Sequence, residues 1–298
     1  MKMIGRIALW TGAVFCGLVL IATALIGPTV YRVVHGVSVY ETVPPSLPAA
    51  TPAPAILVFS KTNGFRDGES IDAANAMFRQ VGKEHGWTMV FSENGAIFNP
   101  AQLSRFKAVV WNSVSGDVLT PAQRKALQDY LKAGGGFVGV HGAGGDPSYR
   151  WRWYVDDLIG AQFIGHTMWP HEQPGTMHVE APAHPIMAGL PRTWARGEEW
   201  YSFDRSVRAK GYHVLVTVDE ATYQPHGLFK EDIHMGADHP LVWTHCVGLG
   251  RAVYSALGHF AASYAEPLHR RMLTNAVAWA AGLTGDDACR GAAASDRR

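Results

Sequence analysis

The first half of the chain alternates short apolar runs with segments whose apolar residues recur at helical spacing. Four of these runs are typical of buried strands: residues 56–60, 87–92, 108–111 and 137–140. One helix is predicted over residues 71–81, and a second begins at Thr120, where Pro121 and Gln123 complete the usual signals of a helix start, and ends at Gly134. Strands separated by helices predict an α/β fold with a mainly parallel sheet covered on both faces.

The second half of the chain is less regular. Residues 151–200 show no sustained periodicity, and a long irregular segment inside a compact domain is usually functional. Beyond it, residues 212–218, 239–244 and 251–257 are predicted as strands. Residues 267–281 are predicted as a closing amphipathic helix.

Polar loops follow three of the early strands, at residues 61–69, 112–117 and 141–150. Because the carboxyl ends of parallel strands meet at one edge of a sheet, these loops should open onto a common ligand crevice. The strand over residues 137–140 ends at His141, which is held between glycines and is therefore the first candidate for chemistry. Gly258 and His259 repeat that arrangement after a later strand.

The N-terminal segment has the composition of a membrane anchor. Residues 7–27 are uncharged and mostly apolar, and about 20 such residues cross the hydrocarbon core as a helix. Residues 1–28 are therefore predicted to be an anchor, and the alternative is a signal peptide cleaved at the small residues 22–24. Since Lys2 and Arg6 precede the apolar stretch, we expect a single-pass membrane protein with its soluble domain on the non-cytoplasmic side, periplasmic or extracellular.

The anchor is followed by a segment rich in proline. Residues 29–54 are predicted to form a stiff, extended linker that holds the domain off the membrane surface. The folded domain is expected to span residues 55–283. Residues 284–298 are small and charged and are expected to be a disordered tail.

Composition narrows the class of ligand. The chain has 26 basic and 25 acidic residues, and a net charge of +1 gives no basis for binding nucleic acid, so a small and roughly neutral ligand is expected. The 14 histidines and 10 tryptophans cluster after His141 and favour a polar pocket with aromatic walls, although any single one is more often core or surface filler. Three cysteines make no disulfide framework, and a bridge between Cys246 and Cys289 could form but is not expected.

Four histidines lie in the irregular segment: His166, His171, His178 and His184. Their spacings of five, seven and six residues match no common pattern of zinc ligands, so neither a metal nor another cofactor is expected, and metal-dependent hydrolysis stays a minor alternative. Glu198 and Glu199 precede aromatic residues. They could be a solvated pair at a strand start, or acid–base groups in a pocket of low dielectric constant, where burial raises a carboxyl pKa.

Several motifs occur in one order between residues 55 and 282: Gly-Gly-Gly-Phe-Val-Gly-Val-His at 134–141, His-Pro-Ile at 184–186 with Gly-Leu-Pro at 189–191, Glu-Glu-Trp-Tyr at 198–201, His-Pro-Leu-Val-Trp at 239–243, and Gly-Arg-Ala-Val-Tyr at 250–254 followed by Leu-Gly-His at 257–259. Together they resemble the ThuA-like (trehalose utilisation) family. The resemblance implies a flavodoxin-like three-layer sandwich related to class I glutamine amidotransferases. It also implies a link to the catabolism of oxidised (keto) disaccharides.

The resemblance places His141 at the strand-to-helix elbow where the amidotransferase relatives carry a nucleophilic cysteine. Thiol-based glutamine hydrolysis is therefore disfavoured, and proton transfer is expected instead. Glu199 and Tyr201 match the family's acidic and aromatic motif, with Glu198 where Asp is usual. The family's Phe-Arg-His after the first strand is Phe-Arg-Asp in this chain, so Asp67 replaces a histidine, and its carboxylate could act as a base or hold a hydroxyl.

The expected function is a carbohydrate-active enzyme of sugar catabolism. It would use acid–base chemistry, by isomerisation or by elimination or hydrolysis, on an oxidised (keto) sugar or glycoside. The alternative is a non-catalytic, membrane-tethered sugar-binding or scaffold domain, which the replacement at Asp67 slightly favours.

The expected catalytic residues are His141, Glu199 and His259. The expected substrate-binding residues are Asn63, Arg66, Asp67, Asn112, His166, His184, Tyr201, His239 and Trp243. The expected partners are a small-molecule carbohydrate and, through the N-terminal helix, the membrane. A homo-oligomer is compatible with the sequence.

Overall fold

The computed structural model describes residues 2–49, 51–147, 149–285 and 289. Its α-helices are α1 (Lys2–His35), α2 (Gly68–His85), α3 (Pro100–Leu103), α4 (Pro121–Lys132) and α5 (Pro267–Ala280). Its strands are β1 (Ala55–Phe59), β2 (Thr88–Ser92), β3 (Ala108–Asn112), β4 (Gly136–Val140), β5 (Phe163–His166), β6 (Gln173–Val179), β7 (Thr193–Glu198), β8 (Tyr201–Phe203), β9 (His213–Asp219), β10 (Pro240–Val247) and β11 (Gly250–Ser255).

The central sheet has nine strands in the order β2-β1-β3-β4-β11-β10-β9-β6-β7. Every neighbouring pair from β2 to β11 is parallel, and every pair from β11 to β7 is antiparallel. The parallel half has the strand order of a flavodoxin-like fold, in which ligands bind at the carboxyl edge. The predicted α/β fold with a mainly parallel sheet is therefore confirmed.

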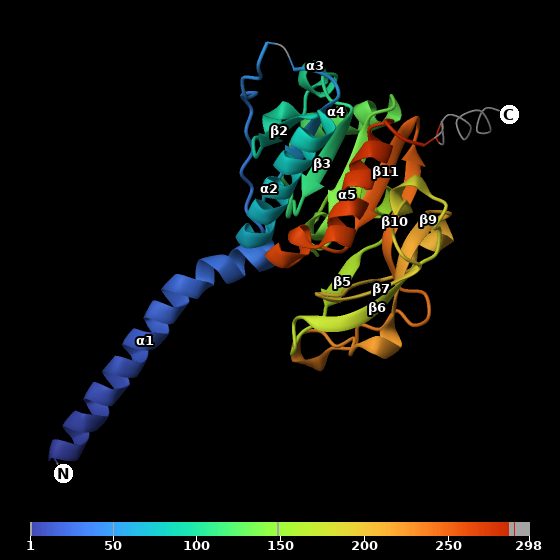
Figure 1. Cartoon of the computed structure of the whole chain (residues 1–298). Helices are drawn as coiled ribbons and strands as arrows, with labels where there is room; N and C mark the ends of the chain where they lie inside the picture. The colour runs from blue at the N-terminus through green and yellow to red at the C-terminus, as the bar shows by residue number, and fades with distance from the viewer. Residues whose placement is uncertain (1, 50, 148, 286–288, 290–298) are drawn as a thin grey trace.

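Helices cover both faces of the parallel half. A Cβ atom on Gly136 in β4 would overlap the backbone of Ala280 in α5, and one on Gly250 in β11 would overlap the backbone of Leu131 in α4. The register of β11 on β4 places these two glycines on opposite faces of the sheet. α4 and α5 are therefore the two outer layers of a three-layer sandwich, and α2 lies beside α5 (Figure 1).

Two helix starts fix the loops at the carboxyl edge. Thr120 and Gln123 form the predicted capping box of α4, in which the side-chain Oε1 of Gln123 accepts the Thr120 N–H at 2.9 Å. Asp67 caps α2, because its Oδ1 accepts the Ser70 N–H at 3.2 Å. The cap holds Asp67 at the end of the β1 loop, where the predicted crevice opens.

The segment predicted to be irregular contains regular structure. Residues 151–200 include a π-helix over Tyr154–Ile159 and the strands β5, β6 and β7. In β6 only alternate residues are buried, and the strand begins Gln-Pro-Gly, so the apolar pattern that signals a buried strand is missing. The sheet is therefore larger than its apolar runs indicate.

The N-terminal helix is longer than predicted. α1 continues through Pro28 to His35, and its part Trp10–His35 is long enough and, on average, apolar enough to cross a membrane. The helix projects away from the domain, with the N-terminus at its far end (Figure 1).

The segment expected to be an extended linker is also different. Its first part, to His35, is helical, and its second part lies along the folded domain. The Glu41 carboxylate pairs with Lys61 at 2.5 Å and accepts the Gly95 N–H at 2.8 Å, and Pro45 O accepts from the Gln102 side chain at 2.6 Å. Residues 36–48 are therefore a strap on the domain, and they do not hold it at a distance.

The C-terminal region carries a disulfide that was not expected. Cys246 in β10 and Cys289 are joined, with their Cα atoms 5.5 Å apart. The predicted disordered tail, residues 284–298, is described only at residues 284, 285 and 289, and the rest of it lies outside the described residues. The free cysteine among the described residues is Cys16 in α1.

Candidate active site

A cavity of about 480 Å³ opens at the carboxyl edge of the parallel strands. The three loops predicted to meet there all contribute to its wall, together with β5, β8 and the loop after β11. Its polar lining consists of Asp67, Ser113, Ser115, His141, Asp146, His166, His171, Glu199, Tyr201, Glu231 and His259. The crevice expected from the strand ends is therefore present.

His141 directly follows β4 and has a left-handed backbone, with φ 48°. Such a conformation is uncommon outside glycine and recurs at functional turns, as the elbow position implies. The His141 Nδ1–H donates to Ala256 O at 2.9 Å. Its Nε2 lies 2.9 Å from Tyr201 Oη, 3.2 Å from Glu199 Oε2 and 3.2 Å from His259 Nδ1.

Glu199 is the centre of the site. Its Oε1 accepts from His166 Nδ1 at 2.9 Å and from His171 Nε2, and its Oε2 lies 3.2 Å from His141 Nε2 and 3.3 Å from His259 Nδ1. The side chain is only 3% exposed. One buried carboxylate thus touches four imidazoles.

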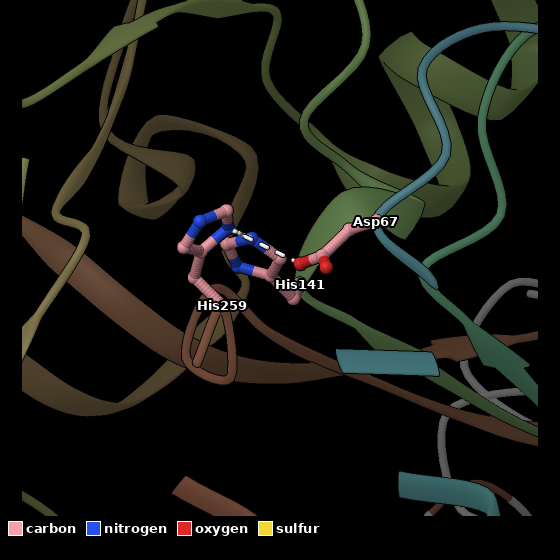
Figure 2. Close-up of side chains that lie close together, drawn as sticks. All are labelled: Asp67, His141 and His259. Atoms are coloured by element: carbon pink, nitrogen blue, oxygen red, sulfur yellow. Dashed lines mark hydrogen bonds and ion pairs between the residues drawn. The ribbon is translucent and has the colours of Figure 1, made fainter. Parts of the chain in front are cut away.

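Asp67, His141 and His259 come from three separate segments and point toward one another (Figure 2). Asp67 Oδ2 lies 3.3 Å from His259 Nδ1. The carboxylate that replaces the family's usual histidine is therefore part of the site.

Glu198 supports this arrangement from behind. Its carboxylate accepts the backbone N–H groups of Gly258, at 3.0 Å, and His259, at 3.3 Å. Arg196 Nη2 lies 3.1 Å from Glu198 Oε2, and both side chains are buried. Glu198 and Glu199 are therefore a buried pair, and the alternative of a solvated pair is excluded.

Burial and charge move the pKa values of the site residues apart. Burial alone would lower the pKa of His141, but the Glu199 carboxylate outweighs it and raises that pKa. Burial, together with the neighbouring histidines, lowers the pKa of His259 to about 4. Burial would raise the pKa of Glu199, but hydrogen bonds from His141 and two other histidines hold it well below its usual value. Burial raises the pKa of Asp67.

Six of the predicted substrate-binding residues lie outside the cavity lining: Asn63, Arg66, Asn112, His184, His239 and Trp243. Three of them hold the fold together. Asn63 donates to Val39 O and Asp117 O at 3.0 and 2.7 Å, Asn112 donates to Ile71 O at 3.1 Å, and the Trp243 indole donates to Ile159 O at 2.8 Å.

The other three have different tasks. Arg66 pairs with Glu93 at 2.8 Å on the surface. His184 caps a short helical turn, and burial lowers its pKa to about 4. His239 Nε2 donates to Tyr201 O at 2.7 Å and so holds β8 in place.

Two features of the site have weak signals in the sequence. His171 contacts Glu199, but its spacing from the other histidines indicates no shared site. Ser113 lines the cavity with φ 48°, and only its place at the end of β3 pointed to it. A side chain's neighbours across the sheet are not encoded in local spacing.

Among the residues that the structure describes, two groups of side chains have the geometry to hold a metal ion: Asp67 with His141 and His259, and His166 with His171 and Glu199. Within each group the ligand atoms lie within 4.8 Å of one another. Imidazole nitrogen and carboxylate oxygen suit zinc and similar divalent ions. The members come from separate elements, which is why histidine spacing alone gave no metal pattern.

Comparison with known proteins gives a consistent family and fold. The sequence model of the family described as trehalose utilisation (ThuA) matches residues 55–280. A ThuA-like protein from Bacteroides uniformis is 24% identical with a TM-score of 0.66, over 79% of this chain and 94% of that chain. A ThuA-like protein from Parabacteroides merdae is 17% identical with a TM-score of 0.53, over 76% and 89% of the two chains. A search of curated proteins gives no significant match.

Proposed function

Because the chain belongs to the ThuA (trehalose utilisation) family, we propose that it is a carbohydrate-active enzyme that performs acid–base chemistry on an oxidised (keto) sugar or glycoside. The observation that carries the proposal is the meeting of His141, Glu199 and His259 in one cavity. Their sequence positions are far apart, so the fold itself assembles the group.

The directions of the pKa shifts assign an acid and a base. His259, with its pKa lowered to about 4, is neutral near pH 7 and can accept a proton, whereas the Glu199 carboxylate raises the pKa of His141 and so favours its protonated form. Groups whose environments separate their pKa values are the usual acid and base of an enzyme site.

A keto sugar has acidic C–H bonds beside its carbonyl. His259 takes one of these protons, the C–H electron pair forms a C=C bond, and the carbonyl oxygen receives a proton from His141. Where the deprotonated carbon carries a hydroxyl, the enediol can accept a proton at the former carbonyl carbon while that hydroxyl loses its proton, which moves the carbonyl and isomerises the sugar. Alternatively, the enol returns its O–H proton to a base and the C=O bond re-forms. The C=C electron pair then shifts to form a new C=C bond as the C–O bond to a glycosidic substituent breaks, and the substituent leaves as an alcohol after it gains a proton. The Tyr201 hydroxyl lies 2.9 Å from His141 Nε2 and can donate a hydrogen bond to the carbonyl oxygen of the sugar.

We propose that the soluble domain lies on the non-cytoplasmic side of a membrane. Lys2 and Arg6 precede the apolar stretch, which favours a cytoplasmic N-terminus. The bond between Cys246 and Cys289 supports the same orientation, since disulfides persist in oxidising compartments.

The proposal is tested by incubating the full chain in detergent with a panel of keto and unoxidised disaccharides, while both binding and product are followed. Conversion of a keto disaccharide is expected, and His141→Ala and Glu199→Gln should each lower the rate by about 10²-fold or more, with an unchanged circular dichroism spectrum. His178→Ala, an exposed histidine on β6, is the matched control and should retain activity. Binding of sugars without any product would support the alternative of a non-catalytic domain. Unchanged rates in both variants would show that His141 and Glu199 do not take part in the reaction.

A second candidate, metal-dependent hydrolysis, is favoured by the two ligand groups around Glu199. A bound ion would polarise a carbonyl or activate a water molecule there. Elemental analysis of the protein purified without chelators decides between the candidates. One or two equivalents of a divalent metal that are lost in Glu199→Gln would favour the metal, and metal-free protein with full activity would exclude it.

A further inference from the structure

We infer that the mouth of the cavity lies in the membrane surface from which α1 emerges, and that the site takes an amphiphilic glycoside whose apolar part points toward the bilayer. The part of this inference that concerns the sugar rests on the proposed function. The membrane contact does not, because it follows from where the anchor ends and what surrounds the mouth.

The end of the anchor is part of the cavity. Val33, in the last turns of α1, lines the cavity together with Phe65. Arg32 donates to Thr62 O, and the Val37 N–H donates to Asn63 O at 2.7 Å. The helix is thus fastened to the β1 loop, which carries Asp67.

The length of the helix brings this junction to the membrane surface. The candidate span Trp10–His35 has 26 residues and is about 39 Å long at 1.5 Å per residue, and the hydrocarbon core is about 30 Å thick. The last turns therefore lie among the lipid head groups, and Val33 is in those turns. The strap over residues 36–48 then runs back along the domain, so no spacer separates the mouth from the bilayer.

Exposed apolar side chains surround the mouth. Phe65, Ile164 and Leu228 line the cavity and are also exposed to solvent. Trp169 and Phe229 directly follow the lining residues Met168 and Leu228 in the chain, and they are 76% and 91% exposed. Both have positive φ, which is unfavourable for bulky residues. Two loops and β5 thus present Phe65, Leu228 and Ile164 at one opening, with the exposed Trp169 and Phe229 next in the chain to lining residues, as expected for a surface that enters a membrane interface.

The cavity lining has a polar part and an apolar part, and the apolar part is nearer the mouth. Its four histidines converge on Glu199, whereas Val33, Phe65 and Leu228 are apolar and belong to the anchor and the exposed loops; the carboxylates of Asp146 and Glu231 lie outside the histidine group. A ligand that matches both parts has a sugar at the histidines and an alkyl or isoprenoid-like portion at the mouth. Such a glycoside can enter from the leaflet without leaving the bilayer.

The membrane contact is tested on the full chain in lipid nanodiscs, after an intact mass has shown that the apolar N-terminal stretch is retained. In a Cys16→Ser background, single spin labels are placed by Phe229→Cys, by Trp169→Cys and, as the control, by Leu249→Cys in the turn before β11. Labels at 229 and 169 should be reached by oxygen and shielded from a water-soluble nickel chelate, and the label at 249 should behave oppositely. Equal access of the chelate to all three labels, or loss of the N-terminal stretch, would overturn the inference.

The substrate class is tested with a matched pair of keto glucosides, one with a methyl and one with a hexadecyl aglycone, both supplied with the nanodiscs. The ratio of kcat/KM for hexadecyl over methyl should exceed about tenfold and should fall several-fold in Phe229→Ser together with Trp169→Ser. Equal kcat/KM for the two glucosides contradicts the amphiphilic ligand. Conversion of a keto disaccharide without conversion of either glucoside contradicts the amphiphilic ligand alone. If none of the three sugars is converted, the enzymatic proposal fails as well, while the spin labels still decide the membrane contact.

Discussion

Glu198 and Glu199 are neighbours with different tasks because they lie at the end of β7, where successive side chains point to opposite sides. Glu198 turns into the fold, pairs with Arg196 and holds the backbone of His259. Glu199 points into the cavity, where its carboxylate contacts the histidines. The separation of tasks places one charge behind the site and one within it.

His269 illustrates how a single buried residue sets the pH dependence of stability. It is fully buried in α5, where its Nδ1–H donates to Ser263 O at 2.9 Å, and burial lowers its pKa to about 3. The unfolded chain binds a proton at this residue near pH 6.5, but the folded chain does not. The stability that the neutral residue contributes above pH 6.5 is therefore lost as pH falls toward 3.

The predicted size of this effect follows from the two pKa values. Between pH 7 and pH 4, His269 should lower the free energy of unfolding by about 3 kcal/mol, and His269→Gln should remove that part of the loss. Urea denaturation in detergent at the two pH values measures the difference, with the exposed His178→Gln as the control. An equal loss in wild type and His269→Gln would show that the residue does not titrate as described.

Sequence reasoning reached His141, Glu199 and His259 because glycines and aromatic residues flank them in recognisable motifs. It also assigned Trp243 and His184 to the ligand, although one is a core residue and the other caps a turn. The type of a side chain shows that it is buried or polar, but whether it faces a core or a cavity depends on the elements opposite it.

At the scale of elements, the strap is the main difference from expectation. A proline-rich segment commonly forms a free spacer, because proline stiffens the chain and removes N–H donors. Here the polar groups of Val39 and Glu41 find partners on the domain, which fixes residues 36–48 against it. Those partners are 20 or more residues away along the chain, so local composition does not reveal them.

The strap should contribute measurably to stability. Glu41→Ala leaves the Lys61 ammonium, which is only 6% exposed, without its carboxylate, and should lower the free energy of unfolding by about 2 kcal/mol. Glu93→Ala removes an exposed partner of Arg66 and should have little effect. Thermal unfolding of both variants in the same detergent measures the contrast, and equal melting temperatures would mean that the strap is not bound in solution.

The parallel strands and their helices could be predicted in order because each strand is a continuous apolar run between turn signals. The antiparallel strands β6 and β7 could not, since one face of each is partly exposed and their apolar residues are few. These strands extend the sheet beyond the flavodoxin-like half.

For the molecule as a whole, the disulfide links the segment that follows α5 to the central sheet. Cys246 and Cys289 enclose β11 and α5 in a loop with a sequence separation of 43. Closing a loop of that length lowers the conformational entropy of the unfolded chain, which stabilises the folded state by about 4 kcal/mol in the chain-entropy description.

Removing the bond tests this role. Cys246→Ala together with Cys289→Ala should lower the free energy of unfolding by up to about 4 kcal/mol, and a reducing agent should lower the melting temperature of the wild type but not of the double variant. Cys16→Ala, in α1, is the control for removing a thiol. A wild type that is insensitive to reduction would show that the bond is absent or contributes nothing.

The most direct test of the central claim, proton transfer at His141 and His259, is deuterium exchange on a keto disaccharide in D₂O, followed by NMR. Wild type should incorporate deuterium at the carbon beside the carbonyl, and His259→Ala should slow this incorporation by about 10²-fold or more while the sugar remains bound. No incorporation by wild type above the rate in buffer, or equal incorporation by wild type and His259→Ala, would contradict the account.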